Sequence, residues 1–138
     1  MKGTVLLVED DTHIRHIYAY ILVQAGYKVI EAVSVATALM HLDVIDLVAI
    51  VLDLRLPNGH GRRVVEELIA KRNDLPAVIL SATPDEYEWS WPVVAALQKP
   101  ARRTPFLKAV ALATRFHEEG VAKLRETARR LKDLVSSS

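Results

Sequence analysis

The order of its apolar segments is the feature that most constrains this chain. Five short apolar runs alternate with segments whose apolar residues repeat at helical spacing. The runs are TVLLV (4–8), YKVIEA (27–32), DLVAIVLDL (46–54), PAVILSAT (76–83) and VVAALQKP (93–100). Strands that alternate with helices form βαβ units. The sequence therefore predicts an α/β protein with a doubly wound, parallel five-stranded sheet covered by helices on both faces.

The segments between the runs carry helix signals. In the first, Ile14, Ile17, Tyr18, Ile21 and Leu22 share one face, Asp11 or Thr12 can cap the start, and Gly26 can end the helix. Further helices are expected over 34–43, with Ser34 as the cap, over 61–73, with Val64, Val65, Leu68 and Ile69 inward, and over 103–120.

The segment expected to hold the fourth helix is too short for a normal one. Pro84 and Pro92 bracket only the seven residues DEYEWSW, about two helical turns. We therefore expect this helix to be stunted or irregular. Tyr87, Trp89 and Trp91 lie here, and two interpretations stay open: they fill the space left by a missing helix, or they form a partner or dimer surface.

Composition narrows the class of protein. The 138 residues are 51% hydrophobic and 25% charged, which suits one domain with a short appendage. The absence of cysteine excludes disulfides and thiolate metal sites. The net charge of +1 gives no indication of nucleic-acid binding. Since no apolar run suits a signal peptide or a membrane span, we expect a cytoplasmic protein without membrane insertion.

Acidic residues gather where predicted strands end. Glu9, Asp10 and Asp11 follow the first strand, and Asp53 ends the third. Ligands of such sheets bind beyond the carboxyl ends of the strands. Like charges this close need a cation, and carboxylates suit magnesium. The alternative is that Asp11 caps the helix while the other acids are only solvated.

Lys99 and Ser81 end two further strands at the same edge. A lysine facing several carboxylates can be a structural ion pair. It can also hold a phosphoryl group on a carboxylate, with the serine hydroxyl as a second donor. Aspartate is a covalent acceptor of phosphoryl groups in several enzyme classes.

Four motifs, VEDD, VLDLRLPNGHG, LSAT and LQKP, occur in this order at the ends of alternating strands. Over residues 3–118 the chain resembles the receiver domain of two-component response regulators. The resemblance implies a flavodoxin-like, CheY-like (βα)5 fold with Asp53 as phosphoacceptor. It implies that Glu9 and Asp10 hold Mg²⁺, with Asp10 the direct ligand and Glu9 acting through water. Lys99 and Ser81 match the residues that contact the phosphoryl group.

The resemblance assigns further roles and shows departures. The backbone carbonyl of Arg55 matches a metal ligand, and Ser81 matches the switch hydroxyl, with Thr83 as a second candidate. Ala96 stands where the family has an aromatic switch residue, so the usual output coupling lacks its ring. His60 stands where an acid is usual, and we assign it no role.

The last residues, 119–138, are expected to form a helical extension of a receiver domain that spans 1–118. Val121, Leu124, Ala128, Leu131 and Val135 repeat at heptad-like steps. Three interpretations stay open: a helix packed on the domain, a dimerisation helix continuing the last core helix, or a linker to a further effector domain. Gly120 either interrupts the helix or softens it.

The expected function is that of a response regulator receiver. It accepts phosphate on Asp53 from a sensor histidine kinase or histidine phosphotransfer protein, depends on Mg²⁺, and signals by protein contact or phosphorelay. It assists its own phosphotransfer and dephosphorylation but is not a conventional enzyme. The alternatives are an unphosphorylated docking or dimerisation module and the receiver part of a longer regulator. A homodimer would use the fourth-helix region or the C-terminal helix.

Overall fold

The computed structural model describes residues 2–84 and 88–137. Its main sheet has five parallel strands in the order β2-β1-β3-β6-β7, which confirms the predicted α/β fold. The strands are β1 (Thr4–Val8), β2 (Lys28–Ala32), β3 (Leu47–Asp53), β6 (Ala77–Ser81) and β7 (Val93–Gln98). Strands β1 and β6 are buried throughout and β3 nearly so, because helices cover both faces of their apolar runs.

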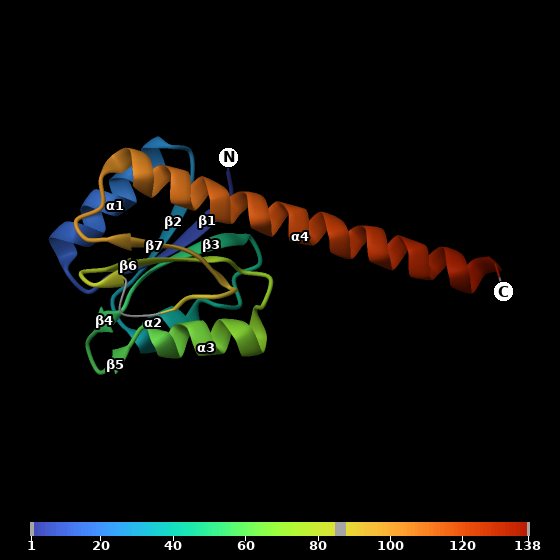
Figure 1. Cartoon of the computed structure of the whole chain (residues 1–138), viewed down its shortest axis with the longest axis horizontal. Coiled ribbons are helices and arrows are strands. Elements are labelled where there is room, and N and C mark those ends of the chain that lie inside the picture. Colours follow the sequence, from blue (N-terminus) through green and yellow to red (C-terminus); the bar gives the residue numbers. More distant parts are fainter. Residues whose placement is uncertain (1, 85–87, 138) are drawn as a thin grey trace.

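The helices form one layer on each face of the sheet (Figure 1). Helices α1 (Thr12–Gln24) and α4 (Arg103–Ser137) cover one face, where the rings of Tyr18 and Phe106 lie 4.8 Å apart. Helices α2 (Val35–Met40) and α3 (Arg62–Lys71) cover the other. The core therefore consists of two apolar clusters, one on each side of the sheet.

The predicted helix starts are confirmed. The Asp11 carboxylate accepts the Ile14 N–H at 3.0 Å, and Ser34 and Thr37 form a reciprocal capping box. Two residues predicted to face inward do not: Ile17 and Ile69 are about half exposed. Both lie at the edge of an apolar stripe whose centre is already covered by the sheet.

The turn after β3 contains a hairpin that sequence reasoning did not predict. Strands β4 (Arg55–Leu56) and β5 (Gly59–His60) pair antiparallel, and Asn58 supplies the positive φ of 59° that the tight turn needs. The hairpin follows β3 closely, and the N–H of its first residue, Arg55, contacts Asp53 of the site described below.

The connection from β6 to β7 contains no α-helix among its described residues, 82–84 and 88–92. Trp89 is partly buried against the core cluster under α3, as the filling interpretation predicts. Trp91 is instead 42% exposed, and its indole N–H donates to the Asn73 carbonyl at 2.9 Å. Tyr87 lies outside the described residues. The two tryptophans therefore have different environments.

Helix α4 continues without interruption through Gly120. Its first half packs on the sheet, and its second half projects well past the rest of the molecule (Figure 1). The side chains from 122 to 136 are all exposed, so the idea of a helix packed on the domain is wrong. The boundary at 118 stays a prediction. In the described part of the chain, no helix is both long and apolar enough to cross a bilayer.

Candidate functional site

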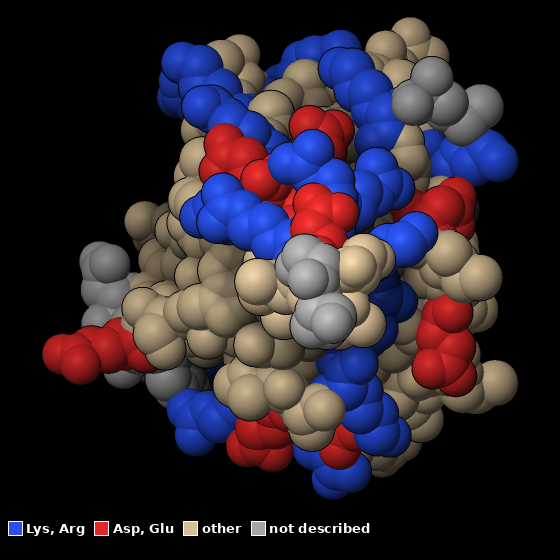
Figure 2. Space-filling model, turned by 90° about the vertical axis from the view of Figure 1, so that its right-hand side faces the viewer, with Lys and Arg blue, Asp and Glu red and all other residues tan. Residues whose placement is uncertain are grey.

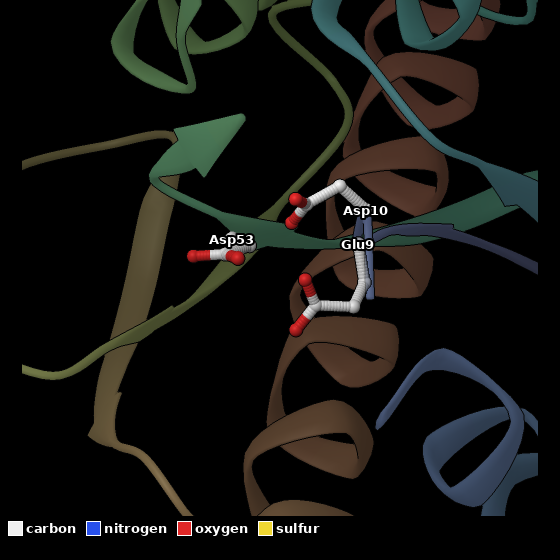
Figure 3. A group of neighbouring side chains, drawn as sticks. All are labelled: Glu9, Asp10 and Asp53. Carbon is white, nitrogen blue, oxygen red and sulfur yellow. The ribbon is translucent and has the colours of Figure 1, made fainter. Parts of the chain in front are cut away.

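Three carboxylates converge at the carboxyl ends of β1 and β3 (Figure 3). Glu9 and Asp10 directly follow β1, and Asp53 is the last residue of β3. One oxygen of each lies within 4.8 Å of the others. Asp10 is exposed, whereas Glu9 and Asp53 are buried. The sheet topology places them together because β1 and β3 are parallel neighbours, with Val8 opposite Leu52.

Lys99 reaches the two buried carboxylates from the end of β7. Its Nζ donates to Glu9 Oε1 at 2.6 Å and to Asp53 Oδ2 at 3.0 Å. Its side chain is only 20% exposed, so both contacts are charge-assisted hydrogen bonds shielded from bulk water. Lys99 and the acids, predicted to share one edge of the sheet, therefore do lie in one cluster.

The cluster shifts the acid–base equilibria of its members. Burial, together with the neighbouring Asp53, raises the pKa of Glu9 from 4.5 to about 7, although Lys99 opposes this. For Lys99, burial lowers the pKa, but the hydrogen bonds to Glu9 and Asp53 outweigh it and the net pKa is raised. At neutral pH Glu9 is therefore only partly ionised in the absence of a further cation.

Asp53 is held by backbone as well as by Lys99. The Arg55 N–H donates to Asp53 Oδ1 at 3.2 Å, so contacts are made at both carboxylate oxygens. Gly61 closes over the same segment: its N–H donates to the Leu54 carbonyl at 2.7 Å, and a Cβ there would lie 2.5 Å from the Asp53 carbonyl oxygen. Only glycine allows this approach, which fixes the turn of the PNGHG motif against the site.

Ser81 and Thr83 occupy the next strand end. Ser81 is buried, its hydroxyl accepts the Thr83 N–H at 3.1 Å, and its carbonyl accepts the Lys99 N–H at 2.8 Å. It lies one position beyond Leu80, which pairs with Asp53 across the sheet. Thr83 is exposed in the following loop. The roles of Thr83 as a second switch residue and of the Arg55 carbonyl as a metal ligand stay predictions.

Sequence reasoning missed Arg15. Its guanidinium donates to the Glu9 carbonyl at 3.1 Å and pairs with Glu31 of β2 at 3.0 Å. These contacts tie the start of α1 to the backbone of the acidic loop. The available signal was its position one helical turn after the Asp11 cap, on the side that faces β2.

A hollow of about 360 Å³ adjoins the cluster on the α1 side. Its lining is mainly apolar, and it consists of Ile14, Ile17, Tyr18, Lys99, Pro100 and Ala101. The Tyr18 hydroxyl accepts the Ala101 N–H at 3.1 Å and so fixes one wall. Lys99 belongs both to this hollow and to the acidic cluster, so the two share one side chain.

The arrangement suits a hard divalent cation and an anionic group together. Three carboxylates offer oxygen ligands of the kind that magnesium prefers, and Lys99 and Ser81 add donors for phosphoryl oxygens. The five residues predicted from the motifs lie at this edge of the sheet: Glu9, Asp10, Asp53, Ser81 and Lys99.

Curated proteins with similar sequences are regulators. The chain is 38% identical over 84 residues to the transcriptional regulatory protein VxrB of Vibrio cholerae, and 32% identical over 88 residues to the phosphate regulon transcriptional regulatory protein PhoB of Escherichia coli. The matches cover 59% and 62% of this chain but only 32% and 38% of those proteins. The chain thus matches about a third of the length of these relatives.

Solved structures share the fold. A sensor protein from Polaromonas sp. JS666 has a TM-score of 0.78 at 26% identity and covers 85% of this chain and 99% of its own. The response regulator TrrA from Thermotoga maritima, solved with Mg²⁺-BeF, has a TM-score of 0.73 at 22% identity over 80% of this chain and 98% of its own. An adenylate cyclase structure from Rhodopirellula baltica, at 18% identity and a TM-score of 0.79, covers 93% of this chain and 98% of its own.

The family comparison agrees with the sheet order and with the cluster at the strand ends. The response regulator receiver domain matches residues 5–110, most of the chain and all five strands except the first residue of β1. The chain belongs to the response regulator receiver domain family.

Proposed function

We propose that this chain is a magnesium-dependent phosphoacceptor that receives a phosphoryl group on Asp53 from a histidine kinase or a histidine phosphotransfer protein. The observation that carries the proposal is the environment of Asp53. It is a buried carboxylate with Lys99 on one oxygen and a backbone N–H on the other, beside two further acids. A purely structural ion pair would not need Asp10 exposed at the same point.

Each member of the cluster has a role in the transfer. A carboxylate oxygen of Asp53 attacks phosphorus while the bond from phosphorus to the donor's imidazole nitrogen breaks, and the imidazole leaves. Bound magnesium would supply positive charge for the phosphoryl oxygens. Glu9, Asp10 and Asp53 would hold it, together with the Arg55 backbone carbonyl. Lys99 is placed to move its hydrogen bond from Asp53 to a phosphoryl oxygen.

Ser81 is proposed as the residue that senses the phosphoryl group. Its hydroxyl now accepts the Thr83 N–H. A rotation about χ1 of Ser81 that carries the hydroxyl oxygen toward a phosphoryl oxygen would break this hydrogen bond and release the loop that begins at Ala82. Because Ala96 supplies no ring to follow the hydroxyl, we propose that the loop itself, rather than an aromatic side chain, carries the change.

The hollow beside Lys99 is proposed as the seat of the phosphodonor protein. A donor histidine must come within bonding distance of Asp53, and Lys99 joins the two sites. Ile17, 59% exposed on α1, offers an apolar contact there. We expect Ile17→Asp to slow transfer from a protein donor while leaving transfer from acetyl phosphate unchanged. Val23→Asp, at an exposed α1 residue that does not line the hollow, is the matched control.

Incubation with acetyl phosphate and MgCl₂, followed by intact-mass measurement, tests the phosphorylation itself. We expect one phosphoryl group per chain, none after chelation of magnesium, and none on Asp53→Asn. Asp43→Asn, an exposed aspartate away from the cluster, should be labelled like the wild type. Equal labelling of Asp53→Asn and the wild type would refute the assignment. No labelling of the wild type by any donor would favour the docking-module alternative.

A further inference from the structure

The projecting half of α4 carries an apolar face that the described part of the molecule leaves exposed. Its large members, with their exposed fractions, are Leu124 (64%), Leu131 (59%), Leu134 (66%) and Val135 (76%). At 100° per residue they fall within one sector together with Phe116, Gly120, Val121 and Ala128, while the lysines, arginines and acids occupy the remaining circumference. In Figure 2, which looks from this end of the molecule, charged side chains gather over the upper part, a tan band of other residues lies below them, and further charged side chains lie along the lower edge.

This apolar face is continuous with the face that packs on the sheet. Phe106, Ala109, Val110 and Ala113 are buried against the core and occupy the same sector of the helix. The sector therefore runs from the part of α4 over the sheet to the part beyond it, with His117, whose ring contacts the Asp74 carbonyl, between the two. From residue 122 to residue 136 every side chain of the helix is exposed, over a length of about 22 Å.

A hollow of about 320 Å³ opens where the helix leaves the sheet. It is lined by Asn73, Asp74, Trp91, Phe116, Gly120 and Leu124. The Trp91 and Phe116 rings meet edge to face at 6.1 Å, and the indole N–H is already satisfied by the Asn73 carbonyl. The exposed parts of both rings are thus rigidly held apolar surface, as in the hot spots of protein interfaces.

Gly120 is unexplained within a single chain. A glycine inside a helix is destabilising relative to alanine. Here a Cβ would meet no atom within 4 Å, so no neighbour in the described part of the chain requires its absence. A side chain from another molecule, seated in the adjoining hollow, provides such a reason.

We propose that the exposed face of α4 binds the same face of a second copy of this chain in an antiparallel pair. Burying Trp91, Phe116 and the four large stripe residues on each copy removes on the order of 700 Å² per chain, close to the ~800 Å² of a standard interface. A two-fold axis near Glu126 makes the surface self-complementary. Each helix tip then reaches the hollow beside its partner's Trp91.

Steric exclusion decides against a parallel pair. The stripe lies on the face by which the first half of α4 covers its own sheet. In a parallel, in-register pair, the partner's first half would have to occupy the volume of that sheet. In the antiparallel pair the two domains lie at opposite ends, and only the projecting halves overlap.

Charges on one flank agree with this orientation. In the heptad of this stripe, Val121 and Ala128 take one core position, and Leu124 and Leu131 take the other. Glu118 and Lys132 then both occupy the flanking position that directly follows the second core position. An antiparallel pair centred between them brings Glu118 of each copy to Lys132 of the other. Arg125 meets its own copy near the axis, which limits the affinity.

Sedimentation equilibrium across micromolar to millimolar concentration tests the pairing. We expect the wild type to approach twice the chain mass of 15.4 kDa. Leu124→Glu and Leu131→Glu should each raise the dissociation constant at least about tenfold. Ala122→Glu, on the opposite side of the helix, should not. A monomeric wild type, or equal effects of Ala122→Glu and Leu124→Glu, would overturn the proposal; circular dichroism confirms that each variant is folded.

Disulfide trapping tests the orientation, and the absence of native cysteine makes it clean. A mixture of V121C and L131C chains should cross-link mainly as the mixed dimer, because these positions meet across the antiparallel interface. Faster formation of V121C homodimers would indicate a parallel pair and refute the geometry. Reversing both flank charges (Glu118→Lys with Lys132→Glu) should restore dimerisation that Glu118→Lys alone weakens.

Discussion

Replacing Lys99 by methionine isolates the electrostatic role of the lysine, because methionine keeps most of the apolar stem. The change removes hydrogen bonds of 2.6 Å to Glu9 and 3.0 Å to Asp53 and leaves two buried carboxyls without their cation. Hydrogen bonds to charged groups contribute about 1.5–3 kcal/mol each. Lys99 is 20% exposed and Glu9 can take up a proton, so we discount the sum of the two hydrogen bonds to about 2 kcal/mol.

The loss depends on pH in a defined direction. The folded-state pKa of Glu9, about 7, exceeds its ordinary value of 4.5, so the folded state binds this proton more tightly than the unfolded state does. The stability that this difference contributes without metal is lost as the pH rises from 4.5 through about 7. Without Lys99, which lowers it, that pKa rises further. The variant therefore holds its proton to higher pH, and the stability gap to the wild type should be widest near pH 8 and narrow toward pH 6.

Urea unfolding in EDTA at pH 6 and pH 8, followed by circular dichroism, measures the difference in the free energy of unfolding between the variant and the wild type. The expected loss of about 2 kcal/mol at pH 8 corresponds to roughly 6–10 °C in Tm for a domain of this size. Lys108→Met, at an exposed lysine of α4, is the control and should change stability by less than about 0.5 kcal/mol. Equal stability of the Lys99 and Lys108 variants at pH 8, or a gap that widens on acidification, would refute the reasoning.

Three further expectations concern the same edge of the sheet. Gly61→Ala places a Cβ 2.5 Å from the Asp53 carbonyl oxygen. The substitution should lower the free energy of unfolding by about 2 kcal/mol in thermal unfolding and weaken magnesium binding. An unchanged Tm would contradict this expectation. Magnesium affinity by calorimetry should rise as the pH increases through about 7, because Glu9 must lose its proton, and Glu9→Gln should flatten that rise. Asp11→Ala removes the α1 cap and should cost about 1 kcal/mol without lowering magnesium affinity; a large loss of affinity would mean that Asp11 is a ligand.

The sheet and the cluster could be predicted because both depend on sequence-local signals. Each buried strand is a short apolar run, and the parallel topology brings the residues that end β1, β3, β6 and β7 to one edge. Asp53 and Lys99 are 46 positions apart, yet their contact follows from strand order alone. The chemistry of magnesium and phosphoryl groups then identifies these residue types as a site.

The remaining details depended on tertiary packing. The Arg15 contact with the Glu9 carbonyl requires the exact path of the acidic loop. Ile17 matches the helical apolar period but lies where the sheet no longer covers it. The different environments of Trp89 and Trp91 depend on the path of the chain between β6 and β7. The described part of that connection has no α-helix, so no periodic pattern of apolar residues could predict its path.

The length of α4 has a mechanical consequence. The helix begins four residues after Lys99 and continues as one rod to Ser137, about 52 Å at 1.5 Å per residue. A tilt of about 5° at its first turn moves the far end by about 4–5 Å. Movement too small to disturb the packing of Phe106 can therefore become a displacement of atomic dimensions at the tip. Because α4 starts close to the acidic cluster, a small rearrangement there would be amplified along the helix to its C-terminal end.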